Sequence, residues 1–153
     1  MGCLESKETA ENTSASVSVF VDSSVWFAAV DTGDGDNARA IRILGTDEPL
    51  LTSDHVLVET WALLRSRLGR YAADRFWDGL RSGGATVEFV SPADLEAAWQ
   101  IGEAYPDQDF SIVDRTSFAV MRRLGIERAA SFDHHFAIFR FGPERRRAFT
   151  ILH

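Results

Sequence analysis

Residues 109–136 constrain the fold most strongly, because a helical pattern is followed at once by a short apolar strand pattern. Ser111 is a suitable N-cap, and Asp114 stands three residues later, where a capping box places its acidic residue. The apolar segment 129–132 predicts a buried parallel strand, with Asp133 at its carboxyl end. One acidic residue therefore begins a helix and another follows a strand, at the edge where open α/β sheets bind ligands.

The same alternation of strand and helix patterns runs along the chain from residue 17. Short β-branched or apolar runs predict strands at 17–21, 50–52, 86–90, 129–132 and 149–152. Helical patterns lie between them at 25–30, 38–44, 56–68, 71–80, 92–104 and 111–124. This order predicts an α/β fold with three layers, α/β/α, around a central and mainly parallel sheet.

Length and composition favour one cytoplasmic domain. The 153 residues suffice for one hydrophobic core, whereas residues 1–16 lack periodicity and are expected to be a disordered or non-native extension before a domain at 17–153. Cys3 is the only cysteine, which excludes a disulfide or a cysteine-based metal site within the chain. No apolar run reaches the length of a membrane span, so we expect no membrane partner.

The formal net charge of −7 argues against nucleic-acid binding by simple electrostatic attraction. Every basic residue except Lys7 is arginine, however, and the planar guanidinium group is well suited to phosphate.

Four acidic residues fall where chemistry is expected: Asp22, Glu59, Asp114 and Asp133. Each aspartate has a structural alternative, because aspartate often caps a helix or a turn. Glu59 points toward a largely apolar face of its helix, where an unpaired carboxylate is costly. We infer from the topology that the four acids converge, and a divalent cation such as Mg²⁺ or Mn²⁺ would then offset their repulsion.

The sequences around these acids resemble the four acidic motifs of PIN domains, most closely those of VapC toxins from type II toxin–antitoxin pairs. The matching segments are Val-Phe-Val-Asp22-Ser-Ser-Val-Trp, Leu-Val-Glu59-Thr, Phe-Ser-Ile-Val-Asp114-Arg-Thr-Ser-Phe-Ala-Val-Met and Ser-Phe-Asp133-His-His-Phe. Two features depart from the family pattern: the N-terminal extension, and His135, where many relatives carry a further acid.

The resemblance implies a Mg²⁺-dependent (or Mn²⁺-dependent) endoribonuclease that is inhibited by a cognate VapB-type antitoxin. It also implies that the four acids are catalytic metal ligands, with Ser23 in a supporting position. We expect Ser111 to support the site as the N-cap beside Asp114. Relatives cut tRNA or a ribosomal RNA loop, and the sequence does not choose between these substrates. The alternative is a catalytically silent PIN-like module that binds RNA or a partner, which the missing acid at His135 leaves open.

Arginines and aromatic side chains are the candidates for contacts with RNA and partners. The arginines proposed to hold the RNA backbone are Arg115, Arg122, Arg123, Arg39 and Arg42, with Arg65 and Arg67 as further candidates, although each could simply be solvated. We expect His134 and His135 to be surface residues on a turn rather than proton shuttles. A homodimer is expected because a small sheet has difficulty burying Trp26, Phe27, Trp61, Phe76 and Trp77.

Two other families with an aspartate after the first strand are disfavoured. Haloacid-dehalogenase-type phosphatases need a second aspartate two residues later, where this chain has Ser24. Receiver domains need a lysine near the aspartate, and Lys7 is the only lysine of the chain.

Overall fold

A five-stranded, entirely parallel sheet forms the centre of the molecule in this computed structural model, which describes residues 17–153. The strand order is β3-β2-β1-β4-β5. The strands are β1 (Val19–Val21), β2 (Leu50–Ser53), β3 (Thr86–Glu88), β4 (Arg128–Ala130) and β5 (Thr150–Leu152). The predicted extension at 1–16 lies outside the described residues.

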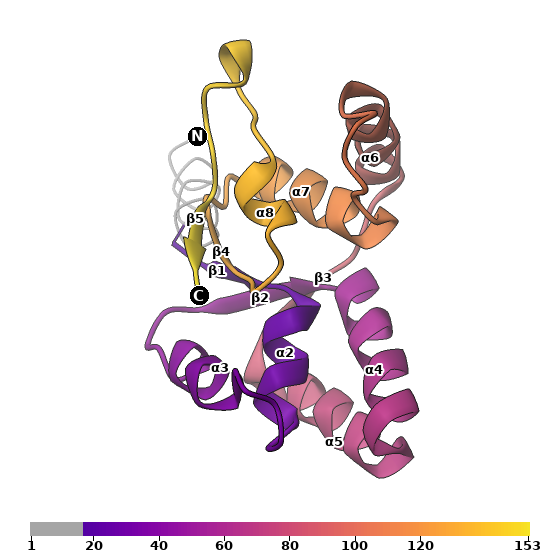
Figure 1. Ribbon diagram of the computed structural model, residues 1–153, viewed down its shortest axis with the longest axis vertical. Coiled ribbons are helices and arrows are strands. Elements are labelled where there is room, and N and C mark those ends of the chain that lie inside the picture. Colours follow the sequence, from indigo (N-terminus) through magenta and orange to yellow (C-terminus); the bar gives the residue numbers. More distant parts are fainter. Residues whose placement is uncertain (1–16) are drawn as a thin grey trace, which may run out of the picture.

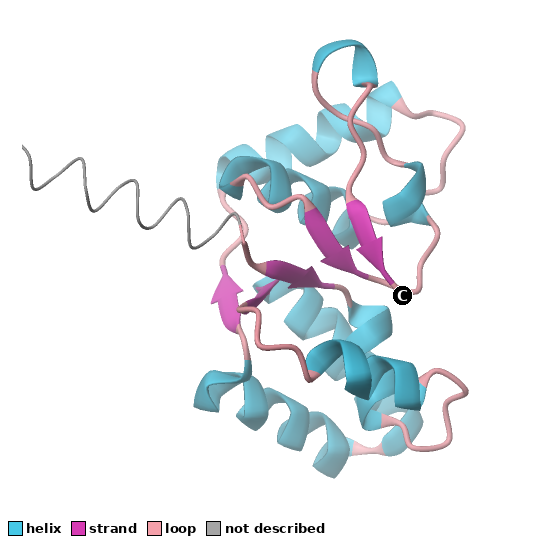
Figure 2. Cartoon of the chain, turned by 90° about the vertical axis from the view of Figure 1, so that its left-hand side faces the viewer, coloured by secondary structure: helices cyan, strands magenta, loops and turns pink. Residues whose placement is uncertain are grey.

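Helices cover the sheet on both sides, which confirms the predicted three-layer α/β/α architecture (Figures 1 and 2). One side carries α2 (Ser23–Val30), α3 (Asn37–Leu44), α4 (Asp54–Leu68) and α5 (Arg70–Gly79). The other side carries α6 (Pro92–Ala104), α7 (Ile112–Leu124) and the short α8 (His135–Ile138). No helix within residues 17–153 is long and apolar enough to cross a membrane.

The topology creates a crevice beside β1. The chain leaves β1 to form β2 and β3 on one side, and later forms β4 and β5 on the other side of β1. Helices that follow β1 and β4 therefore depart toward opposite faces, and a crevice opens at the carboxyl ends of these two strands.

Phenylalanine dominates the core between the sheet and the α7 layer. Phe118 is fully buried, and its ring stacks on Phe139 with centroids 4.4 Å apart and meets Phe136 edge-on at 4.9 Å. Phe20 on the central strand reaches the same cluster through Phe136. These contacts hold α7 and α8 against the sheet, so that the loop between β4 and α8 has a fixed position.

The helix cap expected at Ser111 is present, and Ser91 caps α6 in the same way. Ser91 and Ser111 each form a capping box, in which the carboxylates of Asp94 and Asp114 accept from the cap backbone N–H groups. Gly125 ends α7 in the left-handed region at φ 70°, a conformation that glycine adopts without steric cost. The predictions for the start of α6 and for both ends of α7 are therefore confirmed.

Several element boundaries differ from the sequence prediction. The strand predicted at 17–21 begins only at Val19, and the strand predicted at 129–132 is β4, which ends at Ala130. Neither α8 nor the 3-10 turn Pro143–Arg145 was predicted. The first segment spans four residues and the second spans three, too few for a helical repeat, so periodicity gives no signal for them.

Candidate active site

The four predicted acidic residues line one cavity of about 440 Å³. Asp22 directly follows β1, Asp133 lies in the loop between β4 and α8, Glu59 lies in α4, and Asp114 lies in the first turn of α7. Four separate elements therefore deliver carboxylates to the carboxyl edge of the sheet, as the topology predicts.

Asp22 is held by serine hydroxyls and does not act as a helix cap. It occupies the N-cap position of α2, yet its side chain makes no capping hydrogen bond. Instead, its Oδ2 accepts from Ser24 Oγ at 2.8 Å and from Ser131 Oγ at 3.0 Å. Because only 3% of Asp22 is exposed, these hydrogen bonds replace water around the carboxylate.

Ser23 connects two of the acids. Its hydroxyl lies 3.2 Å from Oε1 of Glu59 and 3.5 Å from Oδ1 of Asp22. These contacts link the Glu59 carboxylate to Asp22, and the supporting role of Ser23 stays a prediction.

Asp114 combines a capping role with a place in the cavity. Its Oδ2 accepts from the backbone N–H of Ser111 at 3.0 Å, and the Nδ1 atom of His135 lies 2.9 Å from the same oxygen. No hydrogen bond to Oδ1 is present within residues 17–153, so that oxygen is left for another ligand. Helix capping and metal binding are therefore compatible at this residue.

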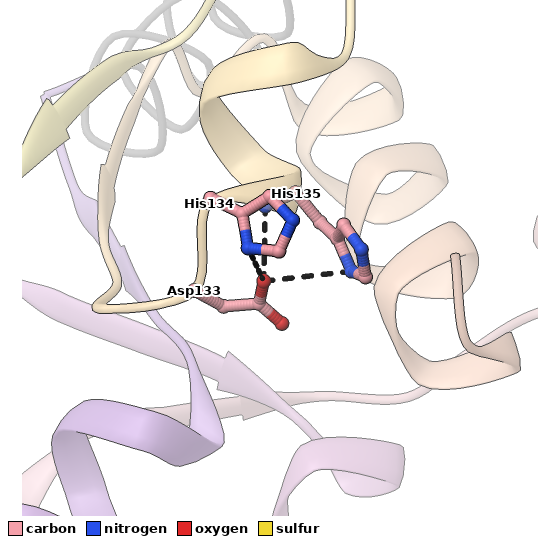
Figure 3. A group of neighbouring side chains, drawn as sticks. All are labelled: Asp133, His134 and His135. Carbon is pink, nitrogen blue, oxygen red and sulfur yellow. Dashed lines mark hydrogen bonds and ion pairs between the residues drawn. The ribbon is translucent and has the colours of Figure 1, made fainter. Parts of the chain in front are cut away.

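Asp133 is surrounded by its own chain neighbours, as Figure 3 shows. Its Oδ1 accepts from the backbone N–H of His135 at 2.9 Å, and the ring Nδ1 atoms of His134 and His135 lie 3.6 and 3.4 Å from this oxygen. The backbone N–H of Asp133 donates to Ser131 Oγ at 3.0 Å. Ser131 thus fixes both Asp22 and Asp133.

The cavity is strongly electronegative. Burial raises the pKa of Asp22, Glu59 and Asp114 above the ordinary carboxyl value, and neighbouring carboxylates add to the rise at each of them. Within the described part of the chain, no arginine or lysine forms an ion pair with any of the four acids, and histidines are their only potentially cationic contacts. Converging oxygen ligands of this kind fit Mg²⁺ or Mn²⁺.

Comparison with known proteins identifies the family. The PIN domain model matches residues 19–142. The chain belongs to the PIN domain family. It is 42% identical over 121 residues to a protein of Mycobacterium tuberculosis (strains CDC 1551 / Oshkosh and ATCC 25618 / H37Rv) named "23S rRNA-specific endonuclease VapC20", covering 78% of this chain and 92% of that protein.

A solved structure agrees with this assignment. The crystal structure of Mycobacterium tuberculosis VapC20, described as a sarcin-ricin loop cleaving toxin, superposes with a TM-score of 0.74 at 38% identity. The alignment covers 78% of this chain and 92% of the other. The resemblance to VapC toxins that the acidic motifs indicate is therefore confirmed, and so is the PIN-like fold.

Three side chains of this PIN domain site were not predicted from the sequence. Ser24 and Ser131 were not singled out, although Val21 pairs with Ala130 in register, so that the residues after these two strands must be neighbours. His135 was expected on the surface, but only 17% of its side chain is exposed and it contacts Asp114. The expectation holds for His134, whose side chain is 77% exposed.

The candidate RNA-binding arginines divide into two groups. Arg39 lies over the ring of Phe132 at 4.8 Å, and Phe132 lines the acidic cavity, as does Arg67. Three others lie elsewhere: Arg115 donates to the Phe110 carbonyl, Arg122 lies over Phe141, and Arg123 forms ion pairs with Glu88 and Asp94.

Arg123 is a poor candidate for RNA contact, because carboxylate and carbonyl oxygens occupy its guanidinium group. It lines a different and larger cavity of about 600 Å³ between α6, α7 and residues 139–145. That cavity lacks the four convergent acids. Arg42 is exposed and stays a prediction.

The aromatic residues expected at an interface are mostly core. Trp26, Phe27 and Phe76 are each no more than 8% exposed, and Trp61 is half-buried and donates to Asp74. Only Trp77 of this set is strongly exposed, at 45%. The core takes up Trp26, Phe27 and Phe76 because α2 packs against α4 and the neighbouring α5, so these three rings do not support a homodimer.

Proposed function

We propose that this PIN domain is a divalent-metal-dependent endoribonuclease toxin of the VapC type. One observation carries the proposal: carboxylates from four separate elements share a cavity, and none of them pairs with an arginine or lysine within residues 17–153. Such a cluster is costly unless a cation is bound, and the curated relatives are named as endonucleases.

The ligands of the proposed metal are Asp22, Glu59, Asp114 and Asp133, with Mg²⁺ or Mn²⁺ as the cofactor. A bound ion of this kind supplies a water of lowered pKa and positive charge for the attacked phosphate. Other residues hold the ligands in place. Ser24 and Ser131 hydrogen-bond Asp22, Ser23 bridges to Glu59, and the Ser111 backbone N–H orients Asp114.

The approach of RNA to this cavity requires charge compensation. Within the described part of the chain, seven acidic residues line the cavity: Asp22, Asp34, Asp36, Glu59, Asp109, Asp114 and Asp133. Arg67 is the arginine among the lining residues, and Arg39 lies nearby but is paired with Asp36. The phosphate backbone would therefore be repelled by the protein alone, and the metal would supply the attraction at the cleavage point.

The substrate is proposed from the relatives. Of the two classes that the sequence leaves open, tRNA and a ribosomal RNA loop, the similar protein is named as specific for 23S rRNA and its structure is described as cleaving the sarcin-ricin loop. We therefore propose that a loop of the large ribosomal RNA is the substrate of this chain.

The proposed partners are a VapB-like antitoxin and a second copy of the chain. Inhibition follows if an antitoxin cation enters the cavity, because it would neutralise the acids without supplying a metal-bound water. For the homodimer, support comes from exposed apolar side chains other than those expected: Val58 on α4, and Leu95 and Trp99 on α6, which are 64%, 45% and 63% exposed. A second copy of the chain would remove these side chains from water.

Cleavage of ribosomal RNA by the purified chain tests the proposed function. Intact ribosomes are incubated with the protein and Mg²⁺ or Mn²⁺, and new 5′ ends are mapped by primer extension. The variants Asp22→Asn and Asp114→Asn, and EDTA, should each abolish cleavage, with circular dichroism confirming the fold. If the wild type leaves both ribosomal RNA and tRNA intact in either metal, the silent binding module becomes the better description.

A further inference from the structure

His135 lies inside the acidic cavity with its ring held in place. Its side chain is 17% exposed, and the ring meets Phe110 edge-on with centroids 5.2 Å apart at 81°. Its backbone N–H donates to Asp133 Oδ1 at 2.9 Å. The ring therefore has little freedom to turn away, and its position belongs to the architecture of the site.

The Nδ1 atom of His135 lies between two of the proposed metal ligands. It is 2.9 Å from Asp114 Oδ2 and 3.4 Å from Asp133 Oδ1. Ligands bound at about 2.0–2.2 Å and at right angles around one ion are themselves separated by about 3 Å. These separations suit adjacent donor atoms of one coordination sphere, and ligand atoms of Asp133, His134 and His135 lie within 4.8 Å of one another (Figure 3).

We infer that His135 is a nitrogen ligand of the bound cation and makes this site select Mn²⁺ or another transition metal over Mg²⁺. This inference rests on the proposed metal site and names the metal class that the site takes. Imidazole suits Mn²⁺, Fe²⁺, Co²⁺ and Zn²⁺, whereas Mg²⁺ strongly prefers oxygen ligands and keeps several waters. A fifth carboxylate at position 135 would favour Mg²⁺ instead, by adding charge and an oxygen donor.

His134 is excluded as the principal nitrogen ligand and serves as the matched control. Its side chain is 77% exposed, and its Nδ1 atom is 3.6 Å from Asp133 Oδ1. Among the histidines of residues 17–153, only His135 contacts a second acid of the cavity, which is Asp114. A ligand at position 134 would have to leave solvent and lose side-chain entropy on binding.

The test measures the metal directly in the full chain, without RNA. Mn²⁺ is added to one equivalent, and electron spin echo envelope modulation detects a coordinated ¹⁴N nucleus. We expect ¹⁴N modulation in the wild type and in His134→Asn, and its loss in His135→Asn and His135→Asp. Absence of modulation from Mn²⁺-loaded wild type, or its loss in His134→Asn with retention in His135→Asn, would overturn the assignment.

Calorimetric titration with Mn²⁺ and with Mg²⁺ gives the selectivity as the ratio of the two dissociation constants. The ratio should move toward Mg²⁺ by about 10-fold or more in His135→Asp, the scale of effect for altered metal environments, and by less than about 3-fold in the matched variant His134→Asp. An equal ratio in wild type and His135→Asp overturns the inference. A wild-type chain that binds Mn²⁺ but does not cleave RNA would count against the proposed function instead.

Discussion

The hydroxyl of Ser131 lies 3.0 Å from Oδ2 of Asp22, although 109 residues separate the two in the sequence. The contact follows from the register of the sheet, in which Val21 pairs with Ala130, so that Asp22 and Ser131 are the first residues beyond two adjacent strands. The backbone N–H of Asp22 also donates to the Ala130 carbonyl at 3.0 Å. Sheet pairing therefore continues directly into the site.

Ser131→Ala should weaken metal binding while leaving the fold intact. The change removes a hydrogen bond to a buried carboxylate and the acceptor for the Asp133 N–H. Loss of such supporting contacts lowers metal affinity by about 10–100-fold. Calorimetric titration with Mn²⁺ checks this, and Ser66→Ala on the exposed side of α4 is the control, which should bind Mn²⁺ like the wild type.

Asp22→Asn should raise the melting temperature of the metal-free protein at pH 7. Burial raises the pKa of Asp22 from the ordinary value of 3.8, so the ionised form destabilises the folded state. We expect a gain of at least about 2 °C, which corresponds to about 1 kcal/mol in a domain of this size. Thermal unfolding followed by circular dichroism in EDTA measures it.

The pH dependence of this gain has a definite sign. The folded state holds the Asp22 proton more tightly than the unfolded state, so the penalty is absent below pH 3.8, grows as pH rises toward the raised pKa, and is complete above it. The difference in melting temperature between Asp22→Asn and wild type should therefore shrink as pH falls from 7 to 4. A difference that widens over this range contradicts the prediction.

Divalent metal should stabilise the wild type, because an ion that binds the folded acids has no equivalent site in the unfolded chain. At 100 times the dissociation constant the gain is about 2.7 kcal/mol, or roughly 5–10 °C. Differential scanning fluorimetry with and without Mn²⁺ checks this, and Asp114→Asn is the control that should respond much less. Equal shifts in both proteins would place the bound ion elsewhere.

Arg123→Ala should destabilise the protein without reducing RNA cleavage by the folded fraction. The guanidinium group pairs with Asp94, which is 3% exposed, and with Glu88, so its loss strands a buried carboxylate. We expect a loss of about 2 kcal/mol in the free energy of unfolding. Urea denaturation measures the loss. A cleavage defect that is largest at low salt and shrinks as salt rises would restore Arg123 as an RNA contact.

Trp99→Glu should disrupt the proposed homodimer. Trp99 is 63% exposed on α6, and a charge in an apolar interface is costly to desolvate. Multi-angle light scattering at micromolar concentration should show a dimer for the wild type and a monomer for this variant. Trp77→Glu on α5 is the matched control and should stay dimeric. A monomeric wild type would contradict the homodimer proposal.

The sequence predicts the fold and the cluster of acids well for physical reasons. Serine caps, glycine ends and β-branched runs are local signals, and alternation of strands and helices leaves few topologies for a parallel sheet. An acid that directly follows a parallel strand must then lie at the carboxyl edge of the sheet. Asp22 and Asp133 are therefore brought near each other by topology, without any information on side-chain packing.

The site residues that were not predicted depend on non-local contacts. Ser131 gains its importance from strand register, and His135 from the packing of its ring on Phe110, which lies 25 positions earlier. The burial of Trp26 and Phe76 likewise depends on how α2 and α5 meet across the structure. Composition shows that such rings are present, but only the fold decides which of them face solvent.

The strand order has an evolutionary consequence. Because the crevice beside β1 arises from the direction in which the chain crosses the sheet, it would persist after any one of the carboxylates is replaced. The acids themselves oppose folding, since burial raises the pKa of Asp22 and Asp114. Replacing one of these acids would therefore give a more stable protein with the same shape and the same docking surfaces. One substitution of an acidic residue is therefore enough to give a protein that binds the same partners and does not cleave RNA, which is the property of a decoy.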